Sequence, residues 1–317
     1  MRRLAVGLAL LCAAAPAEAQ QRHLEILADR FQGELERIAD GFDGVLGAVV
    51  IDLESGARFG VNQTLVFPQG SAIKIVVLLE LFRQRDAGGL RLEEQLRVSR
   101  EDQVGGSGVV QHFAADMSAL SLYDLAVLMI VLSDNAATNL LIERVGMERV
   151  NQTLTELGLG GTRLQRLMIR PSESARGNEN LSTPIEAAEL MARIDRCALP
   201  MERASCEQLR AILEIPKSGA LPQGVRPGVP VAWKPGGITG VSTAWGLVGL
   251  PGRPYAIAVM TNYGQGGGGA AIETVSRAAF EYFARLAGAT PYGTRIPLEL
   301  LAPVLPDTSR TMEGGVP

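Results

Sequence analysis

The chain has 317 residues, of which 47% are hydrophobic, and it carries a formal net charge of −4. This is enough apolar material for one large domain or two intertwined ones, and the acidic balance without a basic run argues against nucleic acid as a partner. The two histidines, His23 and His112, are far from any motif. A Ser-His-Asp triad and a His-ligated zinc site therefore lack their side chains, and neither a metal nor a cofactor is expected.

Residues 1–19 have the three parts of a secretory signal peptide: the basic start Met1-Arg2-Arg3, an apolar run from Leu4 to Ala15, and the small-x-small triplet Ala17-Glu18-Ala19. The apolar run is shorter than the roughly twenty residues that a membrane-spanning helix needs. We expect a secreted or periplasmic mature protein that is monomeric and free of the membrane once the signal is removed.

The two ends of the mature chain read as strands and helices. Residues 24–38 have helical spacing, and two β-rich runs, 45–53 and 57–61, flank a turn at Glu54-Ser55-Gly56. Near the other end, two further runs at 244–250 and 255–262 precede a helix at 270–286. We therefore expect both ends to share one antiparallel sheet packed with helices.

The middle of the chain reads as nearly all helix, at residues 71–85, after the capping box Ser121 to Asp124, at 136–145 and from Thr183-Pro184 onward. The predicted fold class is α/β (α+β), with an antiparallel sheet flanked by helices and an inserted all-α domain. The α/β domain takes residues 20–66 and 225–288, the all-α domain takes 67–224, and a proline-rich tail takes 289–317. Residues 167–181 form the longest connection without predicted structure, and such loops are often functional.

Cys197 and Cys206 are the two cysteines left once the leader is removed. In an exported protein a local disulfide between them is plausible. The alternative is two unpaired thiols at a helix-loop junction. Neither interpretation makes them catalytic.

Three of the thirty basic residues are lysines, and two of these, Lys74 and Lys234, lie in short motifs. A guanidinium stays protonated, whereas a buried ammonium can lose its proton and act as a base. A chain that otherwise uses arginine would keep lysine where that chemistry is needed. A general preference for arginine, with three leftover lysines, is the alternative.

Ser71-Ala72-Ile73-Lys74 opens a strongly apolar helix, with the serine and the lysine on one face. Burial and the positive end of the helix dipole would both lower the pKa of the lysine and make it a base for the serine. Taken alone, this pattern better fits a helix cap near a surface lysine.

Two more short motifs follow. Ser133-Asp134-Asn135 interrupts two helices, and Lys234-Pro235-Gly236-Gly237 follows an apolar run, with the lysine at the end of a strand. Separately they could be an Asx-capped helix end and an ordinary glycine-rich strand end.

In this order and with these spacings, the three motifs resemble those of the penicillin-recognising serine hydrolases, most closely the class A β-lactamases, over about residues 46–283. The resemblance implies an exported serine hydrolase that cleaves a β-lactam or related amide through an acyl-enzyme. It assigns the nucleophile to Ser71, its base to Lys74, a proton shuttle to Ser133 and an electrostatic anchor to Lys234. The backbone N–H groups of Ser71 and Gly237 would form the oxyanion hole, and the remaining substrate contacts would come from Asn135, Gly236 and Thr239.

The sequence departs from the family pattern in the loop and at Pro235. Met168 occupies the position of the loop glutamate that activates the deacylating water, and Glu173 or Glu179 is a possible loop carboxylate in its place. Arg166 and Asn180 fall where the family has an ion pair, so a looser loop is expected.

Pro235 stands where the family has a serine or threonine, and it supplies neither a hydroxyl nor an N–H group. Carboxylate recognition would then fall to Thr239, Ser242, Thr243 or Lys234. Two other functions stay open: a D-Ala-D-Ala peptidase or esterase-like hydrolase, and a sensor that β-lactams acylate slowly.

Overall fold

The computed structural model describes residues 14–290 and 293–294. Most of the predicted leader and most of the predicted tail therefore lie outside the described residues. The first helix, α1, runs from Ala14 to Asp40 and so includes the helix predicted at 24–38. In the part of the chain that is described, no helix has the length and apolar character needed to cross a membrane.

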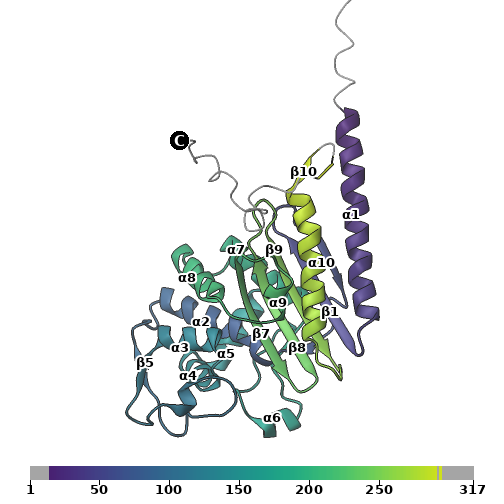
Figure 1. Cartoon of the computed structure of the whole chain (residues 1–317). Helices are drawn as coiled ribbons and strands as arrows, with labels where there is room; N and C mark the ends of the chain where they lie inside the picture. Colours follow the sequence, from purple (N-terminus) through teal and green to yellow (C-terminus); the bar gives the residue numbers. More distant parts are fainter. Residues whose placement is uncertain (1–13, 291–292, 295–317) are drawn as a thin grey trace, which may run out of the picture.

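As predicted, both ends of the chain contribute to one antiparallel sheet. It has five strands in the order β2-β1-β9-β8-β7 (Figure 1). Its strands are β1 (Val45–Asp52), β2 (Arg58–Val61), β7 (Val231–Ile238), β8 (Val241–Val248) and β9 (Tyr255–Asn262). Side chains alternate between the two faces of a strand. In β1, Val49 and Ile51 join the core on one face, and Ala48 and Val50 join the core on the other.

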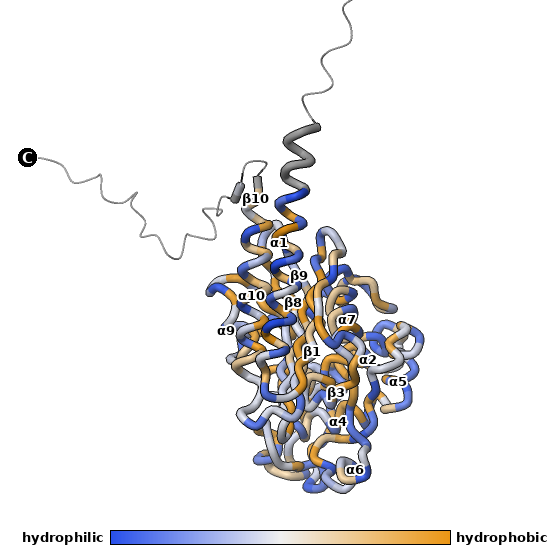
Figure 2. Tube along the Cα trace, turned by 90° about the vertical axis from the view of Figure 1, so that its right-hand side faces the viewer, coloured by the Kyte–Doolittle hydropathy of each residue, from blue (hydrophilic) through white to orange (hydrophobic). Residues whose placement is uncertain are grey.

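Helices α1 and α10 (Gly269–Ala287) pack side by side over one face of this sheet (Figure 1). The rings of Phe31 and Tyr282 stack between them with centroids 4.6 Å apart. Figure 2 shows hydrophobic residues concentrated along the strands behind these helices. Burial of that apolar surface is what holds the helices on the sheet.

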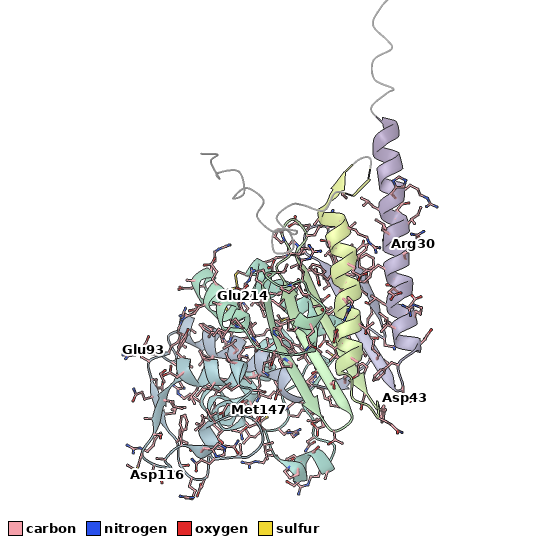
Figure 3. The ribbon with its side chains drawn as sticks, viewed as in Figure 1. Arg30, Asp43, Glu93, Asp116, Met147 and Glu214 are labelled. Atoms are coloured by element: carbon pink, nitrogen blue, oxygen red, sulfur yellow. A yellow bond between two sulfur atoms is a disulfide. The ribbon has the colours of Figure 1, made fainter. Side chains whose placement is uncertain are left out.

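The other face of the sheet carries the helical part, which α2 (Lys74–Asp86) traverses with nearly every residue buried. A helix that is apolar all round belongs inside a core. Met147 packs against this core, while Glu93 and Asp116 lie at the outer edge, away from α1 (Figure 3). The remaining helices are α3 (Leu122–Val131), α4 (Asn135–Val145), α5 (Met147–Glu156), α6 (Pro171–Ala175), α7 (Pro184–Arg196), α8 (Arg203–Glu214) and α9 (Ala220–Gln223).

Two predicted helix starts have their expected caps. The Ser121 hydroxyl accepts a hydrogen bond from the Asp124 N–H group before α3, and the Thr183 hydroxyl accepts one from Glu186 before α7.

Short elements that were not predicted also occur: the strand pairs β3 (Phe67–Pro68) with β6 (Leu181–Ser182), β4 (Gln95–Arg97) with β5 (Ala119–Ser121) and β10 (Ala289–Thr290) with β11 (Gly293–Thr294), and the 3₁₀ turns η1 (Gly70–Ile73) and η2 (Val110–His112).

The structure corrects two local expectations. Lys234 lies inside β7 and not at a strand end, because the strand continues through Pro235 to Ile238. β7 is an edge strand, where a missing N–H group is tolerated. The connection at 167–181 is not without structure, since it contains α6. Cys197, at the end of α7, and Cys206, in α8, are joined by a disulfide.

Candidate active site

Ser71 lies in η1, directly before α2, and this turn is pressed against β7. A Cβ atom added to Gly70 would lie 2.6 Å from the backbone N of Gly237, and one added to Gly236 would lie 2.1 Å from the carbonyl O of Gln69. No side chain fits at either position. The two glycines thus let the backbone of the strand touch the turn, and this contact brings Gly237 and Ser71 to the wall of one cavity.

Gln69 is a buried polar side chain that ties this turn to the sheet. Its amide donates to the carbonyl O of Phe67 at 2.8 Å and accepts from the Trp245 indole at 2.9 Å, and its own backbone carbonyl O accepts from the Thr243 hydroxyl at 2.9 Å. Gln69 was not among the residues singled out from the sequence. The available signal in the sequence was a lone amide directly after the apolar pair Phe67-Pro68.

The corner between α3 and α4 presents Ser133 to two lysines. Ser133 has a positive φ of 54°, which is uncommon for a residue other than glycine. The next residue, Asp134, holds the corner by accepting from the N–H groups of Val109, Val110 and Ala137.

Lys74 and Lys234 meet at the Ser133 hydroxyl. The Nζ atom of Lys74 lies 3.2 Å from Ser133 Oγ, 2.7 Å from Ser133 O and 3.0 Å from Asn135 Oδ1. The Nζ atom of Lys234 lies 3.0 Å from the same hydroxyl. The predicted reach from Lys74 to Ser71 is not one of the hydrogen bonds that this amine makes. The hydroxyl of Ser133 thus links two amines in a chain along which a proton can pass.

Burial changes the chemistry of both amines. It lowers the pKa of Lys74 to about 7, against the opposing effect of the Asp134 carboxylate. It also lowers the pKa of Lys234 well below its ordinary value, and the nearby charges of Lys74 and Lys217 lower it further. A neutral amine can accept a proton near neutral pH, as a general base must.

Lys217, the third lysine of the chain, lies near enough to Lys234 for its charge to lower the pKa of Lys234. Its Nζ atom donates to the carbonyl O atoms of Leu213 and Ile215 at 2.6 and 2.9 Å, and burial lowers its pKa to about 8. A Cβ atom on Gly219 would lie 2.3 Å from the Trp233 ring, so this segment presses on β7 next to Lys234. Lys217 was not predicted from the sequence, although the scarcity of lysine was its signal too.

Met168 lines the cavity beside Ser71, with 5% of its surface exposed. The two carboxylates considered in its place are bound elsewhere and do not line that cavity. Glu173 accepts from Arg176 at 2.7 Å and from Asn178 at 2.8 Å. Glu179 accepts from Arg166 at 2.7 Å.

A looser loop was predicted because Asn180, the expected partner of Arg166, is neutral. This expectation is wrong, because Arg166 has another partner. Arg166 has its carboxylate partner in Glu179, and the two side chains are 9% and 15% exposed. The Asn180 amide accepts from the N–H groups of Gln165 and Arg166 and donates to the carbonyl O of Arg166. An ion pair and an amide network together close the loop.

The cavity has a volume of about 430 Å³. Thr239 does not line it and lies in the exposed β7–β8 turn. Of the hydroxyls that could replace the one missing at Pro235, Thr243 donates to the carbonyl O of Gln69, whereas Ser242 accepts from the Gly268 N–H group and can still donate. Among residues 14–290 and 293–294, no three His, Cys, Asp or Glu side chains gather to hold a metal ion. The cavity is lined by Gly70, Ser71, Gly106, Ser107, Asn135, Arg166, Met168, Ile169, Arg170, Pro171, Ser174, Asn180, Gly237 and Ile238.

Solved structures share this arrangement of elements. The β-lactamase of Sphaerobacter thermophilus DSM 20745 is 29% identical, with a TM-score of 0.73 over 79% of this chain and 96% of that one. The ancestral GNCA class A β-lactamase is 27% identical, with a TM-score of 0.74 over 80% and 100%. A point mutant of PBP-A, solved as an acyl-enzyme complex with penicillin G, is 29% identical, with a TM-score of 0.72 over 82% and 96%.

The fold is therefore that of the β-lactamases and transpeptidases, as the sequence predicted. The sequence model of the beta-lactamase enzyme family matches residues 30–283. The chain belongs to this family, in its class A branch, and is a serine β-lactamase-like hydrolase.

Proposed function

We propose that this protein is an exported, monomeric hydrolase that opens a β-lactam or a related amide through an acyl-enzyme on Ser71. The observation that carries the proposal is the Ser133 hydroxyl, held within 3.2 Å of the Lys74 amine and 3.0 Å of the Lys234 amine. Such a pair of amines suits acyl transfer without histidine or metal.

In the acylation step, neutral Lys74 accepts the proton of the Ser71 hydroxyl while Oγ bonds to the substrate carbonyl carbon. The N–H groups of Ser71 and Gly237 stabilise the oxyanion, a role in which one donor is worth about 3 kcal/mol of barrier. The carbon-nitrogen bond then breaks. The proton taken by Lys74 passes through the Ser133 hydroxyl to the leaving nitrogen, which leaves Ser71 acylated and both lysines as they began.

Asn135 and Lys234 complete this site as substrate contacts. The Asn135 carbonyl O already accepts from Lys74, and its amide nitrogen donates to the carbonyl O of Gly105 at 3.1 Å. With the Thr243 hydroxyl donating to Gln69, a substrate carboxylate on the leaving-group side would rely on the charges of Lys234 and its neighbour Lys217.

Deacylation is the slow step of the proposed cycle, because the Met168 thioether cannot take a proton from water. A PBP-A variant with a leucine-to-glutamate substitution was solved as a penicillin G acyl-enzyme, so acylation by a penicillin occurs in a relative of this chain. Met168 also favours the second candidate, a D-Ala-D-Ala peptidase or esterase, which would transfer or release its natural acyl group by other means.

The decisive test mixes the purified mature protein with a chromogenic cephalosporin and follows both absorbance and intact mass. Slow turnover with a transient adduct is the expected result. A permanent adduct without turnover would favour the peptidase or the slowly acylated sensor, and no adduct would reject acylation altogether. Ser71→Ala is the matched control, since it should lose all labelling.

Export and oligomeric state need separate measurements. Expression of the full chain in a bacterial host, followed by N-terminal sequencing of the periplasmic fraction, should find a start at Gln20. Light scattering of that material should give the mass of one chain. An uncut cytoplasmic product would reject the signal peptide.

A further inference from the structure

We propose that the cavity beside Ser71 is a subsite for a negatively charged substituent on the acyl half of the substrate, with the Arg170 guanidinium as its counter-ion. This inference rests on the proposed function for the identity of the acyl group. It adds a substrate class to that function.

The direction of the substrate follows from the proton path. The leaving nitrogen must approach Ser133, because this hydroxyl delivers its proton. Ser133, Lys74 and Lys234 are not among the residues that line the cavity, whereas Ser71 and Gly237 are. The substrate half on the other side of the carbonyl carbon, which stays attached to Ser71, therefore extends into the cavity.

The side chains that line the cavity leave one positive charge without a negative partner. Its lining includes two arginines and no carboxylate. Arg166 is neutralised, since its Nε and Nη2 atoms lie 3.1 and 2.7 Å from Glu179 Oε2. Arg170 is exposed, and among the described residues its side chain has no hydrogen bond or ion pair. One uncompensated positive charge thus faces the cavity region of a chain whose net charge is −4.

The other uncharged polar side chains of the lining, apart from the reactive Ser71, each make hydrogen bonds within the described structure. Ser107 donates to the carbonyl O of Ser133 at 2.7 Å, and Asn135 is bound to Lys74 and Gly105. Ser174 donates to Glu179, and Asn180 is bound to backbone groups of the loop. Arg170 is therefore the lining side chain that offers an unpaired positive charge to an anionic ligand group, while Asn135 keeps one amide hydrogen for the substrate amide.

The backbone around Arg170 is held in place. Asn139 binds both backbone groups of Met168, and α6 begins at Pro171. Ile169 has a φ of 55°, unusual for a β-branched residue, and a Cβ atom on Gly106 would lie 3.2 Å from its side chain. The loop thus closes against Gly106 and forms an apolar wall, with Arg170 as the charged group at its side. Such a mixture of apolar wall and few polar groups is typical of ligand sites.

Benzylpenicillin and its α-carboxy derivative, carbenicillin, differ by one carboxylate on the acyl side chain and so test the subsite directly. We would measure the second-order acylation constants of both compounds by intact mass for the wild type, Arg170→Gln and Arg170→Lys. Arg163→Gln is the matched control, because Arg163 is an exposed arginine just before this loop that does not line the cavity.

Arg170→Gln should lower the carbenicillin constant about fivefold, as expected for a partly exposed ion pair, and leave the benzylpenicillin constant within about twofold. Arg170→Lys should retain most of the preference, and 0.5 M salt should weaken it in the wild type. An equal fall for both compounds, or an unchanged ratio, would overturn the proposal.

Failure of the proposed function would look different, because the wild type would then acylate with neither compound. In that case calorimetry on Ser71→Ala and on Ser71→Ala/Arg170→Gln would still test the subsite. Tighter binding of carbenicillin that disappears in the double variant supports the subsite, and equal binding by both proteins rejects it.

Discussion

Asn139 holds both backbone polar groups of Met168: its carbonyl O accepts the Met168 N–H at 2.7 Å, and its amide donates to the Met168 carbonyl O at 3.2 Å. The side chain at position 168 is thereby fixed at the wall of the cavity that Ser71 lines. We therefore expect a group placed at this position to meet the proposed acyl-enzyme.

Met168→Glu should therefore shorten the lifetime of the acyl-enzyme by about tenfold or more, as expected when a general base is supplied. The measurement is the decay of the adduct mass after a pulse of β-lactam. Met168→Gln, of similar size but unable to take a proton, is the control. Equal decay of both variants would mean that the loop does not direct residue 168 at the ester.

The pKa of each lysine can be measured separately, because the chain contains only three. Labelling with ¹³C-lysine should give one resonance for each, with Lys74 titrating at about 7 and Lys217 at about 8. A base acts in its neutral form, so the acylation rate should rise as the pH increases through 7 and level off above it.

Lys217→Gln provides a second check on this group. Removing a nearby positive charge should raise the pKa of Lys234, since Lys217 helps to lower it. An unshifted Lys234 resonance, or a Lys74 that titrates near 10.5 as a free lysine does, would contradict the described burial.

Gly236 and Gly237 are neighbours with different surroundings. A Cβ atom would meet Gln69 O at 2.1 Å at position 236, but at position 237 its nearest neighbour is Val241 O at 3.6 Å. Gly236→Ala should separate β7 from η1, with a loss of about 1–3 kcal/mol in the free energy of unfolding and little acylation left. Gly237→Ala is the control and should fold with wild-type stability. Chemical denaturation and labelling measure both, and equal behaviour would argue against the close contact.

The Cys197–Cys206 disulfide closes a short loop. Replacement of both cysteines by alanine should lower the free energy of unfolding by about 2–3 kcal/mol, mainly through the greater entropy of the unfolded chain. Labelling at Ser71 should be unchanged at low temperature, because neither cysteine lines the cavity. Thermal unfolding with and without reductant checks the first point, and lost labelling in the folded variant would contradict the second.

Local patterns predicted much of the fold. The β1–β2 and β8–β9 hairpins and helices α1 and α10 follow from periodicity and turn residues, which act over a few neighbours in sequence. The extent of β7 was missed because Pro235 usually ends a strand, and only the position of β7 at the sheet edge makes it acceptable.

The candidate site likewise has features that the sequence predicted and features that only the tertiary structure decided. The sequence by itself determined the three motifs, and with them Ser71, Ser133 and Lys234. Only the tertiary structure decided that Glu179 binds Arg166, that Gln69 braces the catalytic turn through Trp245, and that Lys217 lies beside Lys234. The sequence predicted that the pKa of Lys74 is lowered, but the structure decided its extent, to about 7, because desolvation depends on how completely the assembled sheet and helices exclude water.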